Sequence, residues 1–536
     1  MSILTHILGW PLIAAIALAF IPRGNRPLIR AVALLATAAS AVLAGIMFVK
    51  FGAAAMNEDG YRFVQQAAWA PSLGISYHVG VDGINVALVL MGAIVAFAAA
   101  CVSWEIKERE KEFYILLMVM TGGILGAFAS LDLFFFYFFH ELALVPTFLM
   151  IALWGRGEQR TYATFQITLY LSIGALIALI GLVALYLQAG AGTFDIPALT
   201  RHLAENRLSE GSQAFIFPML LFGFGILVSL WPFHSWAPLG YGSAPSATAM
   251  LHAGVLKKFG LYGLIRVAVP MMPDGARDWA WVIAALCLGN LVYCGWVAMR
   301  QKDFNWLIGY SSVAHMGFAF LGIATLGLVG ITGAVLVMVA HGFLAAVAFG
   351  LNGYVYHHTG TLQLDQLGGL WRKLPFIGTA MLMAAFAGCG LPGFANFAGE
   401  MTVLFGAWNT FKTITVFACW GALIIGAVYM LRAVRSILHG PLSEKWKDLP
   451  DAPGYWRKLP YALLLGCLIL FGCFPRLLTD KITPSVAAAL QAASLIPAEP
   501  VPQNAPMRIP QRERVTNLHP GNSAGSDRLA SAINKP

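Results

Sequence analysis

Three charged side chains lie within long apolar stretches of the chain: Glu141, Lys258 and Glu400. Glu141, for example, is part of the stretch FFFYFFHELALVPTFLM. An ion near the centre of a bilayer costs about 2.5 to 3.5 kcal/mol on insertion scales, so such residues are rare without a function. Burial disfavours the charged form, which brings the protonated and deprotonated states closer in free energy. These three residues therefore indicate a path for an ion or a proton.

Histidines and a second lysine lie in the same apolar stretches. His315 and His341 are candidate relay groups, because imidazole gains and loses a proton near neutral pH. From the residues alone, a hydrogen-bonded core histidine is the favoured explanation of each. Three further residues in these stretches are auxiliary candidates for proton transfer: His234, His252 and Lys257. His140 lies on another helical face than Glu141, so we expect it to serve packing or an interhelical hydrogen bond.

The composition indicates a polytopic membrane protein, since 59% of the residues are hydrophobic and 11% are charged. Apolar stretches of about 18 residues or more predict transmembrane helices. About fourteen are expected, near residues 3–22, 31–50, 79–103, 113–130, 131–154, 162–189, 213–236, 243–270, 279–299, 304–325, 329–356, 378–410, 413–436 and 459–478.

Lysine and arginine are concentrated in alternate loops between these stretches. Under the positive-inside rule this pattern places both termini on the outer face of the membrane. The net charge of +9 is explained by this topology, and no cluster of basic and aromatic residues suggests nucleic acid. The seven cysteines form no C-x-x-C pair, so we expect no cofactor and no metal in this chain. Nor do the residues offer the cluster of oxygen ligands that a dedicated sodium site would favour.

Two of the expected helices contain breaks. The seventh is interrupted at residues 231–238 (WPFHSWAP) and the twelfth at residues 388–393 (GCGLPG), where proline and glycine weaken helix geometry. Each break falls on the fourth helix of a five-helix unit, and an odd number of helices inverts the second unit relative to the first. Paired breaks of this kind point to the site of an inverted-repeat transporter.

The expected fold is therefore an all-α polytopic membrane protein with two inverted five-helix repeats, each with a broken helix. The predicted segments are residues 1–112 (helices 1–3), 113–270 (first repeat, helices 4–8), 279–438 (second repeat, helices 9–13), 439–478 (a loop and helix 14) and 479–536 (a disordered or strap-like tail).

Four strings resemble one known family in the right order: DLFFFYFFHELALVPTFLMIALWG, PFHSWAPLGYGSAPSATAMLHAGVLKKFGLYGLIR, LIGYSSVAHMGF and GLPGFANFAGE. They are similar to the antiporter-type, proton-translocating subunits of respiratory complex I, and most similar to the chain-M type. The resemblance implies a subunit of an NADH-quinone oxidoreductase in a bacterial inner membrane. It also implies neighbouring antiporter-like subunits and, more distantly, a flavin and iron–sulfur arm.

The resemblance assigns roles at matching positions. Glu141 matches the glutamate of the fifth helix, Lys258 the central lysine of the eighth, and Glu400 the terminal glutamate of the twelfth. His315 and His341 match polar relay positions. Protons in this family are thought to move along a hydrated axis through these groups, while quinone reduction elsewhere supplies the energy.

The sequence departs from the family at two places. Leu227 stands where the family has a lysine whose charge modulates the fifth-helix glutamate, so Glu141 lacks its expected partner. His140, His234, His252 and Lys257 are candidates to substitute for that lysine. Asn305-Trp306 replaces a basic pair, which we expect to change a surface rather than the axis. The absent lysine keeps a second hypothesis open: a subunit of a non-redox cation/proton antiporter or of an ion-coupled uptake complex.

Overall fold

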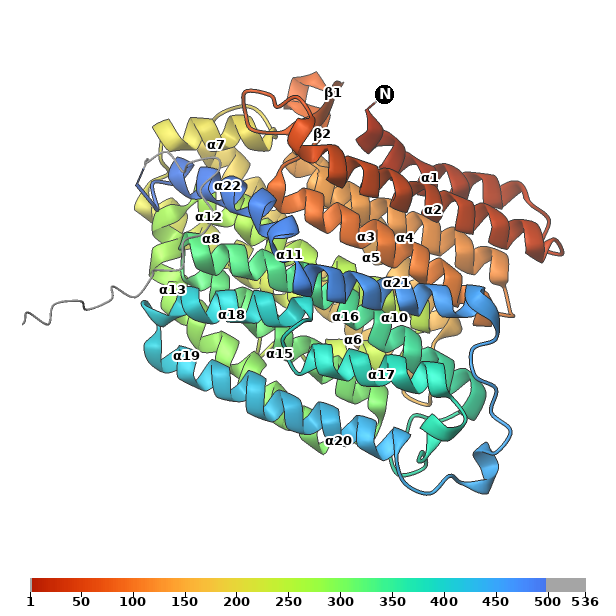
Figure 1. The fold of residues 1–536 in the computed structure, drawn as a ribbon. Coiled ribbons are helices and arrows are strands. Elements are labelled where there is room, and N and C mark those ends of the chain that lie inside the picture. Colours follow the sequence, from red (N-terminus) through yellow and green to blue (C-terminus); the bar gives the residue numbers. More distant parts are fainter. Residues whose placement is uncertain (1, 498–536) are drawn as a thin grey trace, which may run out of the picture. The chain divides into compact units, whose positions relative to one another are not determined.

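The computed structural model describes residues 2–497, and most of them lie in helices (Figure 1). The α-helices are α1 (Ile3–Phe20), α2 (Arg26–Lys50), α3 (Gly83–Val102), α4 (Glu110–Ala129), α5 (Leu133–Trp154), α6 (Arg160–Ala189), α7 (Ile196–Glu205), α8 (Glu210–Val228), α9 (Trp236–Ser243), α10 (Ser246–Leu251), α11 (Lys258–Gly263), α12 (Val269–Met271), α13 (Pro273–Leu288), α14 (Gly295–Arg300), α15 (Phe304–Ala324), α16 (Leu328–Thr359), α17 (Pro375–Gly388), α18 (Ala395–Trp408), α19 (Lys412–Cys419), α20 (Gly426–Leu438), α21 (Gly454–Cys473) and α22 (Arg476–Ala492). Two strands, β1 (Arg62–Ala70) and β2 (Ile75–Val81), pair antiparallel.

Within residues 2–497, eleven helices are long and apolar enough to cross a membrane. The other three expected spans are present but interrupted. The stretch 243–270 is divided among α10, α11, α12 and two π-helical segments, η4 (His252–Leu256) and η5 (Leu264–Ala268). The stretch 378–410 is split into α17 and α18, and 413–436 contains a π-helical segment, η8 (Trp420–Ile425). The all-α membrane fold is confirmed.

Both predicted helix breaks are present. The first separates α8 from α9, and Ser229 ends α8 in the left-handed conformation with φ 71°. Asn290 holds this break, since its side-chain amide donates to the Ser229 carbonyl (2.9 Å) and accepts from the Trp231 amide (2.8 Å). The second break separates α17 from α18, where Gly390 and Gly393 have positive φ. The inverted relation of the two units remains a prediction.

The helices that carry the candidate residues lie inside the bundle. The apolar window of α16 is buried along its whole length, and that of α15 almost so. Around α16 pack α3, α10, α15, α18 and α21 (Figure 1). In contrast, fewer than half of the residues in the apolar windows of α1, α2 and α6 are buried. The polar groups are therefore held by the most enclosed helices.

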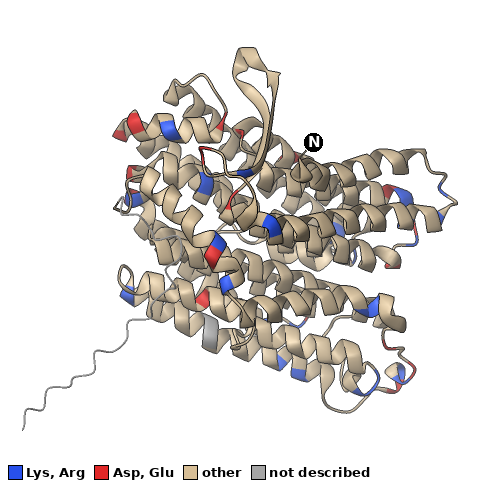
Figure 2. Ribbon diagram, turned by 45° about the horizontal axis from the view of Figure 1, so that its top comes forward, with Lys and Arg blue, Asp and Glu red and all other residues tan. Residues whose placement is uncertain are grey.

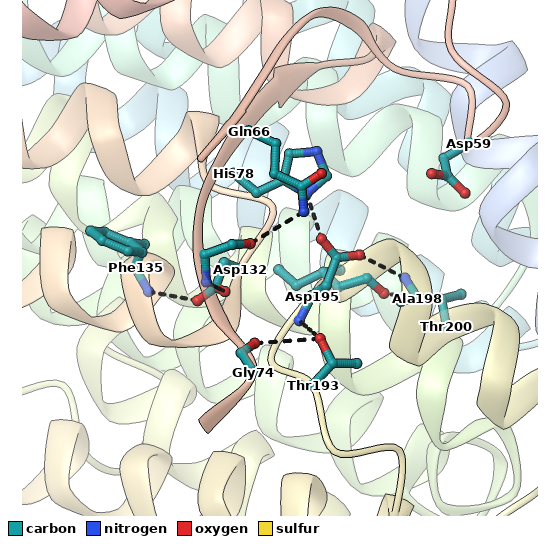
Figure 3. Close-up of polar contacts among 12 residues, drawn as sticks. Asp59, Gln66, Gly74, His78, Asp132, Phe135, Thr193, Asp195, Ala198 and Thr200 are labelled. Atoms are coloured by element: carbon teal, nitrogen blue, oxygen red, sulfur yellow. Dashed lines mark hydrogen bonds and ion pairs between the residues drawn. The ribbon is translucent and has the colours of Figure 1, made fainter. Parts of the chain in front are cut away.

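Two aspartates, Asp132 and Asp195, link the β1–β2 hairpin to the starts of α5 and α7, and we call this part of the molecule the hairpin end. Asp132 caps α5 by accepting from the amides of Phe134 and Phe135 (2.9 and 3.2 Å), and its other oxygen accepts from the Ser76 amide. Asp195 caps α7 and pairs with His78 at 2.5 Å (Figure 3). Asp132 thus joins the start of α5 to the hairpin.

The structure differs from the sequence-based expectation at the start of the tail. Residues from 479 were expected to be disordered or strap-like, but α22 continues to Ala492. Its buried residues Leu478, Ile482, Val486 and Leu490 recur every four positions, which forms one apolar stripe. This stripe packs against α3 and α16. The rest of the predicted tail, residues 498–536, lies outside the described residues.

Charged residues lie mainly in loops and at helix ends, with few inside the bundle (Figure 2). The end formed by the α14–α15, α16–α17 and α20–α21 connections is rich in lysine and arginine, and we call it the basic face. It includes Arg300, Lys302, Arg372, Arg435, Lys445 and Lys447. The hairpin end lies opposite to it, at the other ends of the helices (Figure 1).

Candidate functional site

Lys258 and His341 meet where two helices approach each other closely. The Lys258 ammonium lies 2.8 Å from His341 Nδ1, although the two residues come from α11 and α16. Gly254 and Gly342 make this approach possible, because a Cβ added at Gly254 would lie 2.9 Å from the Gly342 carbonyl oxygen. A larger residue at either position would push the helices apart. The two glycines therefore set the distance between lysine and histidine.

A π-helical turn directs the Lys258 side chain. In η4 the backbone hydrogen bonds run over five residues, as between the Lys257 amide and the His252 carbonyl (3.1 Å). The wider turn leaves the Ala253 carbonyl available, and the Lys258 ammonium donates to it at 2.6 Å. Such turns are rare and occur frequently at functional sites. Lys258 is fully buried and uses one protein carbonyl and one imidazole as its partners.

The polar chain continues from His341 through His315 to Glu400. The two imidazole rings have centroids 5.5 Å apart, and His315 Nε2 lies 3.5 Å from Glu400 Oε1. His315 Nδ1 faces the Ser311 carbonyl at 2.7 Å. Four of the five predicted principal residues are thus brought together in the order Lys258, His341, His315, Glu400, from four different helices.

The geometry at His315 determines how protons are placed. A carbonyl oxygen only accepts, so the short contact with Ser311 requires a proton on His315 Nδ1. His315 Nε2 lies 3.3 Å from the Gly388 carbonyl oxygen and 3.5 Å from Glu400 Oε1, an atom without a hydrogen-bond partner among the described residues. Direct transfer of a proton from Nε2 to Glu400 therefore requires the two side chains to move closer together.

Glu141 stands apart from this chain. Its side chain is 33% exposed, and Oε1 lies 3.4 Å from His140 Nδ1. His140 was expected to serve packing or an interhelical hydrogen bond, and its Nδ1 has no hydrogen-bond partner among the described residues. The His140 ring also stacks on Phe259 at 4.0 Å, next to Lys258 in sequence. No hydrogen bond joins Glu141 to Lys258 within the described residues.

Lys257 occupies a separate polar niche beside the first helix break. Its ammonium donates to the Ser312 hydroxyl (2.9 Å) and carbonyl (3.2 Å) and lies 3.5 Å from the Ser229 hydroxyl. Leu227, two residues before Ser229, is buried. A buried cation thus lies at the break where the family lysine is absent, but its partners are neutral oxygens. No contact joins Lys257 to Glu141 within the described part of the chain.

The two auxiliary histidines lie outside the central chain. His252 is buried between the rings of Trp236 and Tyr241, and its Nδ1 has no hydrogen-bond partner among the described residues. His234 lies in the first break, with Nδ1 3.2 Å from the Pro232 carbonyl. Neither residue contacts Lys258, His341 or Glu400 directly. Their place in proton transfer remains a prediction.

Two small cavities adjoin the chain. One of about 20 Å³ is bordered by Ser312, His315 and His341 and extends along α15 and α16 to Asn352. A second of about 10 Å³ is bordered by His315, Glu400 and Tyr429. A buried water needs roughly 10 to 15 Å³ of such space and polar partners, so the first cavity has room for a water molecule beside the histidines.

Sequence reasoning missed three polar residues that the structure places around the site, Asn290, Ser312 and Asn352, and it misjudged a fourth, Asn305. Asn305 was expected to change a surface, but it is 1% exposed and bonds to Asn352. A polar residue inside an apolar span was the available signal, as in the strings CLGNLVYC and FGLNGYVY. Uncharged amides are common enough in such spans that their importance emerges only from their contacts.

No group of three or more His, Cys, Asp or Glu residues within 2–497 is arranged to hold a metal ion. The seven cysteines are free thiols at separate positions. The site therefore consists of amine, imidazole, carboxyl and hydroxyl groups, whose shared chemistry is proton exchange.

Comparisons with known proteins agree with this chemistry. The sequence model of a family described as "NADH:quinone oxidoreductase/Mrp antiporter, TM" matches residues 130–426. A curated relative, "NADH-quinone oxidoreductase subunit M" of Rhodobacter capsulatus, is 34% identical over 503 residues, which cover 92% of this chain and 96% of that protein.

Solved structures give the same result for the fold. A chain of "Respiratory complex I from Thermus thermophilus with bound NADH" matches with a TM-score of 0.82 and 28% identity, covering 92% of this chain and 99% of that one. A chain of the Mrp complex from Dietzia sp. DQ12-45-1b matches with a TM-score of 0.79 and 20% identity, covering 91% and 98%. At that identity the second likeness shows the fold alone.

Proposed function

The chain belongs to the NADH:quinone oxidoreductase/Mrp antiporter transmembrane family, and we propose that protons pass through it along Lys258, His341, His315 and Glu400. It is a proton-translocating membrane subunit of an NADH-quinone oxidoreductase, complex I, and works with other membrane subunits. The likeness to an Mrp complex concerns the fold, so the antiporter hypothesis has less support.

One observation carries the proposed path: the chain of contacts from the Lys258 ammonium through two imidazoles to the Glu400 carboxyl group. Each member can hold or release a proton, and each adjacent pair is close enough for direct transfer or transfer through one water. A buried set of this kind is unfavourable for folding alone, because charges without ion-pair partners are costly in an apolar interior. Proton transfer accounts for its presence.

The energy for transfer comes from outside this chain. Moving one charge against 100 mV takes about 2.3 kcal/mol. Quinone reduction elsewhere in the complex supplies it, by changing the electrostatic field or the helix positions around the buried groups. A neighbour's charge acts on Glu141 first, since that side chain is partly open to the surface of the subunit.

Membership of the family supports a proposal for the partners and the membrane. Further antiporter-like subunits cover the exposed helix faces, and the flavin and iron–sulfur arm is reached only through them. The chain lies in the bacterial inner membrane with both termini on the periplasmic side. The concentration of Lys and Arg on the basic face supports this orientation, since cytoplasmic loops carry an excess of these residues.

The test replaces Lys258 by methionine in the chromosomal copy, with Lys302→Met at the exposed basic face as the control. NADH-driven proton uptake is measured in inverted membrane vesicles and expressed per assembled complex. We expect Lys258→Met to lose at least about 90% of this uptake, in line with the effect of removing a proton-transfer group. Unchanged uptake in an assembled Lys258→Met complex would contradict the proposed path.

A further inference from the structure

Two buried asparagines face each other where α15 and α16 approach the basic face. Asn352 Nδ2 donates to Asn305 Oδ1 at 2.9 Å, and both side chains are 1% exposed. The remaining amide atoms, Asn305 Nδ2 and Asn352 Oδ1, have no hydrogen-bond partner in the described residues. An unpartnered buried amide atom is costly, and an ordered water molecule is its usual partner. The pair thus offers one donor and one acceptor to water.

Behind the pair lies the cavity of about 20 Å³ that ends at the proton-transfer groups. Asn352 borders one end of it, and Ser312, His315 and His341 border the other. The cavity runs from Phe304 to His315 along α15, which is about 17 Å at 1.5 Å per residue. It therefore connects the level of the amide pair with the middle of the bundle.

The middle of this cavity has small, apolar walls. Ala345, Ala348 and Ile308 line it between Asn352 and the histidines. Apolar constrictions hold water weakly and control conduction by wetting and drying. The cavity as it stands has room for about one or two water molecules, so a chain along the whole passage forms only when its walls move apart, and the amide pair fixes its outer end.

Half-buried charged groups lie on the outer side of the pair. Asp303 caps α15 by accepting from the Asn305 amide at 2.8 Å, and Arg156 lies 4.5 Å from the centre of the Tyr356 ring. The Glu105 carboxylate approaches the backbone at Gly353, next to Asn352. Burial raises the pKa of Asp303 and lowers the pKa of Arg156, and both groups lie in connections between helices. Protonatable groups thus stand between the basic face and the amide pair.

We propose that the Asn305–Asn352 pair and the cavity behind it form the route by which protons reach Lys258 and His341 from the basic face, carried on a chain of water molecules. This inference rests on the proposed function, because it supplies the axis with a source of protons. The outer carboxyl groups of Glu105 and Asp303 collect the proton, and the amide pair orients the first water. Ser312 and His341 receive the proton at the inner end, next to Lys257 and Lys258 respectively.

The experiment compares two substitutions at one position. Asn352→Leu fills the mouth of the cavity with an apolar side chain, whereas Asn352→Ser keeps a small polar group and leaves room for water. NADH-driven proton uptake per assembled complex is measured in inverted vesicles. We expect a loss of roughly tenfold in Asn352→Leu and of less than about twofold in Asn352→Ser, as for a passage controlled by wetting.

A matched control variant and a second variant that obstructs the passage distinguish a blocked route from a general loss of structure. Thr332→Val also removes a buried, unpartnered polar atom from α16, but far from the cavity, and should leave uptake unchanged. Ala348→Leu obstructs the passage from another position and should act like Asn352→Leu. If Asn352→Leu fails to assemble, Ala348→Leu carries the test.

The outcomes separate the two proposals. Normal uptake in Asn352→Leu and Ala348→Leu, together with loss in Lys258→Met, would overturn the route while leaving the axis intact. Equal losses in Asn352→Leu and Asn352→Ser would also overturn it, because a purely structural hydrogen bond fails in both. Normal uptake in Lys258→Met would count against the proposed function instead.

Discussion

The two carboxyl groups of the site, Glu141 and Glu400, have similar partners but different surroundings. Each lies about the same distance from a histidine, 3.4 Å for Glu141 and 3.5 Å for Glu400. The Glu141 side chain is 33% exposed, whereas that of Glu400 is 6% exposed. Glu400 ends the series of buried groups, whereas the His140 ring beside Glu141 stacks on Phe259 and no hydrogen bond joins Glu141 to Lys258 among the described residues.

The two pairs also differ in whether the histidine and the glutamate belong to the same helix. His140 precedes Glu141 on the same helix, so the pair moves as one unit and responds to whatever lies outside α5. His315 comes from α15 and Glu400 from α18, so their contact depends on how two helices pack. A shift of either helix would change the second pair and leave the first intact. The comparison suggests that Glu141 senses a neighbouring subunit and Glu400 transfers the proton.

The largest expected effect comes from removing the buried carboxyl group. Glu400→Gln keeps the size and polarity of the side chain but cannot bind or release a proton. We expect NADH-driven proton uptake per assembled complex to fall at least about tenfold. Glu444→Gln, at a position 82% exposed in the α20–α21 loop, is the control. Wild-type uptake in the Glu400→Gln complex would show that the chain ends elsewhere.

Substitution of His315, beside Glu400, should reduce proton uptake more than substitution of His140, beside Glu141. His315→Gln interrupts the chain between His341 and Glu400, and we expect uptake to fall roughly tenfold. His140→Gln changes only the group beside Glu141 and should cost about twofold or less. Both variants are measured in parallel vesicle preparations. A larger effect at His140 would reverse the assignment of the two carboxyl groups.

Chemical labelling tests the difference in exposure directly. In the isolated chain in detergent, a hydrophobic carbodiimide should modify Glu141 several times faster than Glu400, because only Glu141 is partly open to the surface. The rates are obtained by mass spectrometry of the two peptides. A chain with Glu141→Gln identifies the label at that peptide. Faster modification of Glu400 would contradict the buried position of that group.

The smallest effect is expected from restoring the family lysine. Leu227→Lys should leave proton uptake within about twofold, because Glu141 already has His140 beside it and a buried cation, Lys257, lies at the break. Leu227→Met controls for the change of shape. A several-fold gain in uptake, absent from Leu227→Met, would instead show that the missing lysine limits this chain.

The sequence was sufficient wherever local composition decides the structure. Long apolar stretches predicted the transmembrane helices, and proline and glycine predicted both helix breaks. The cost of burying an ion singled out Glu141, Lys258 and Glu400, and the resemblance added His315 and His341. Each of these inferences depends on residues close together in the chain.

The tertiary structure decided which side chains meet, and no local pattern of residues predicts those contacts. Gly254 and Gly342 are separated by many residues, yet their close approach brings Lys258 to His341. The π-helical turn at 252–256 rotates Lys258 away from the direction that regular helix geometry predicts. Asn305 and Asn352 looked like ordinary polar residues until α15 and α16 placed them together. Helix positions follow from hydrophobicity, which is local, whereas contacts between polar groups depend on packing between distant segments, which no local pattern contains.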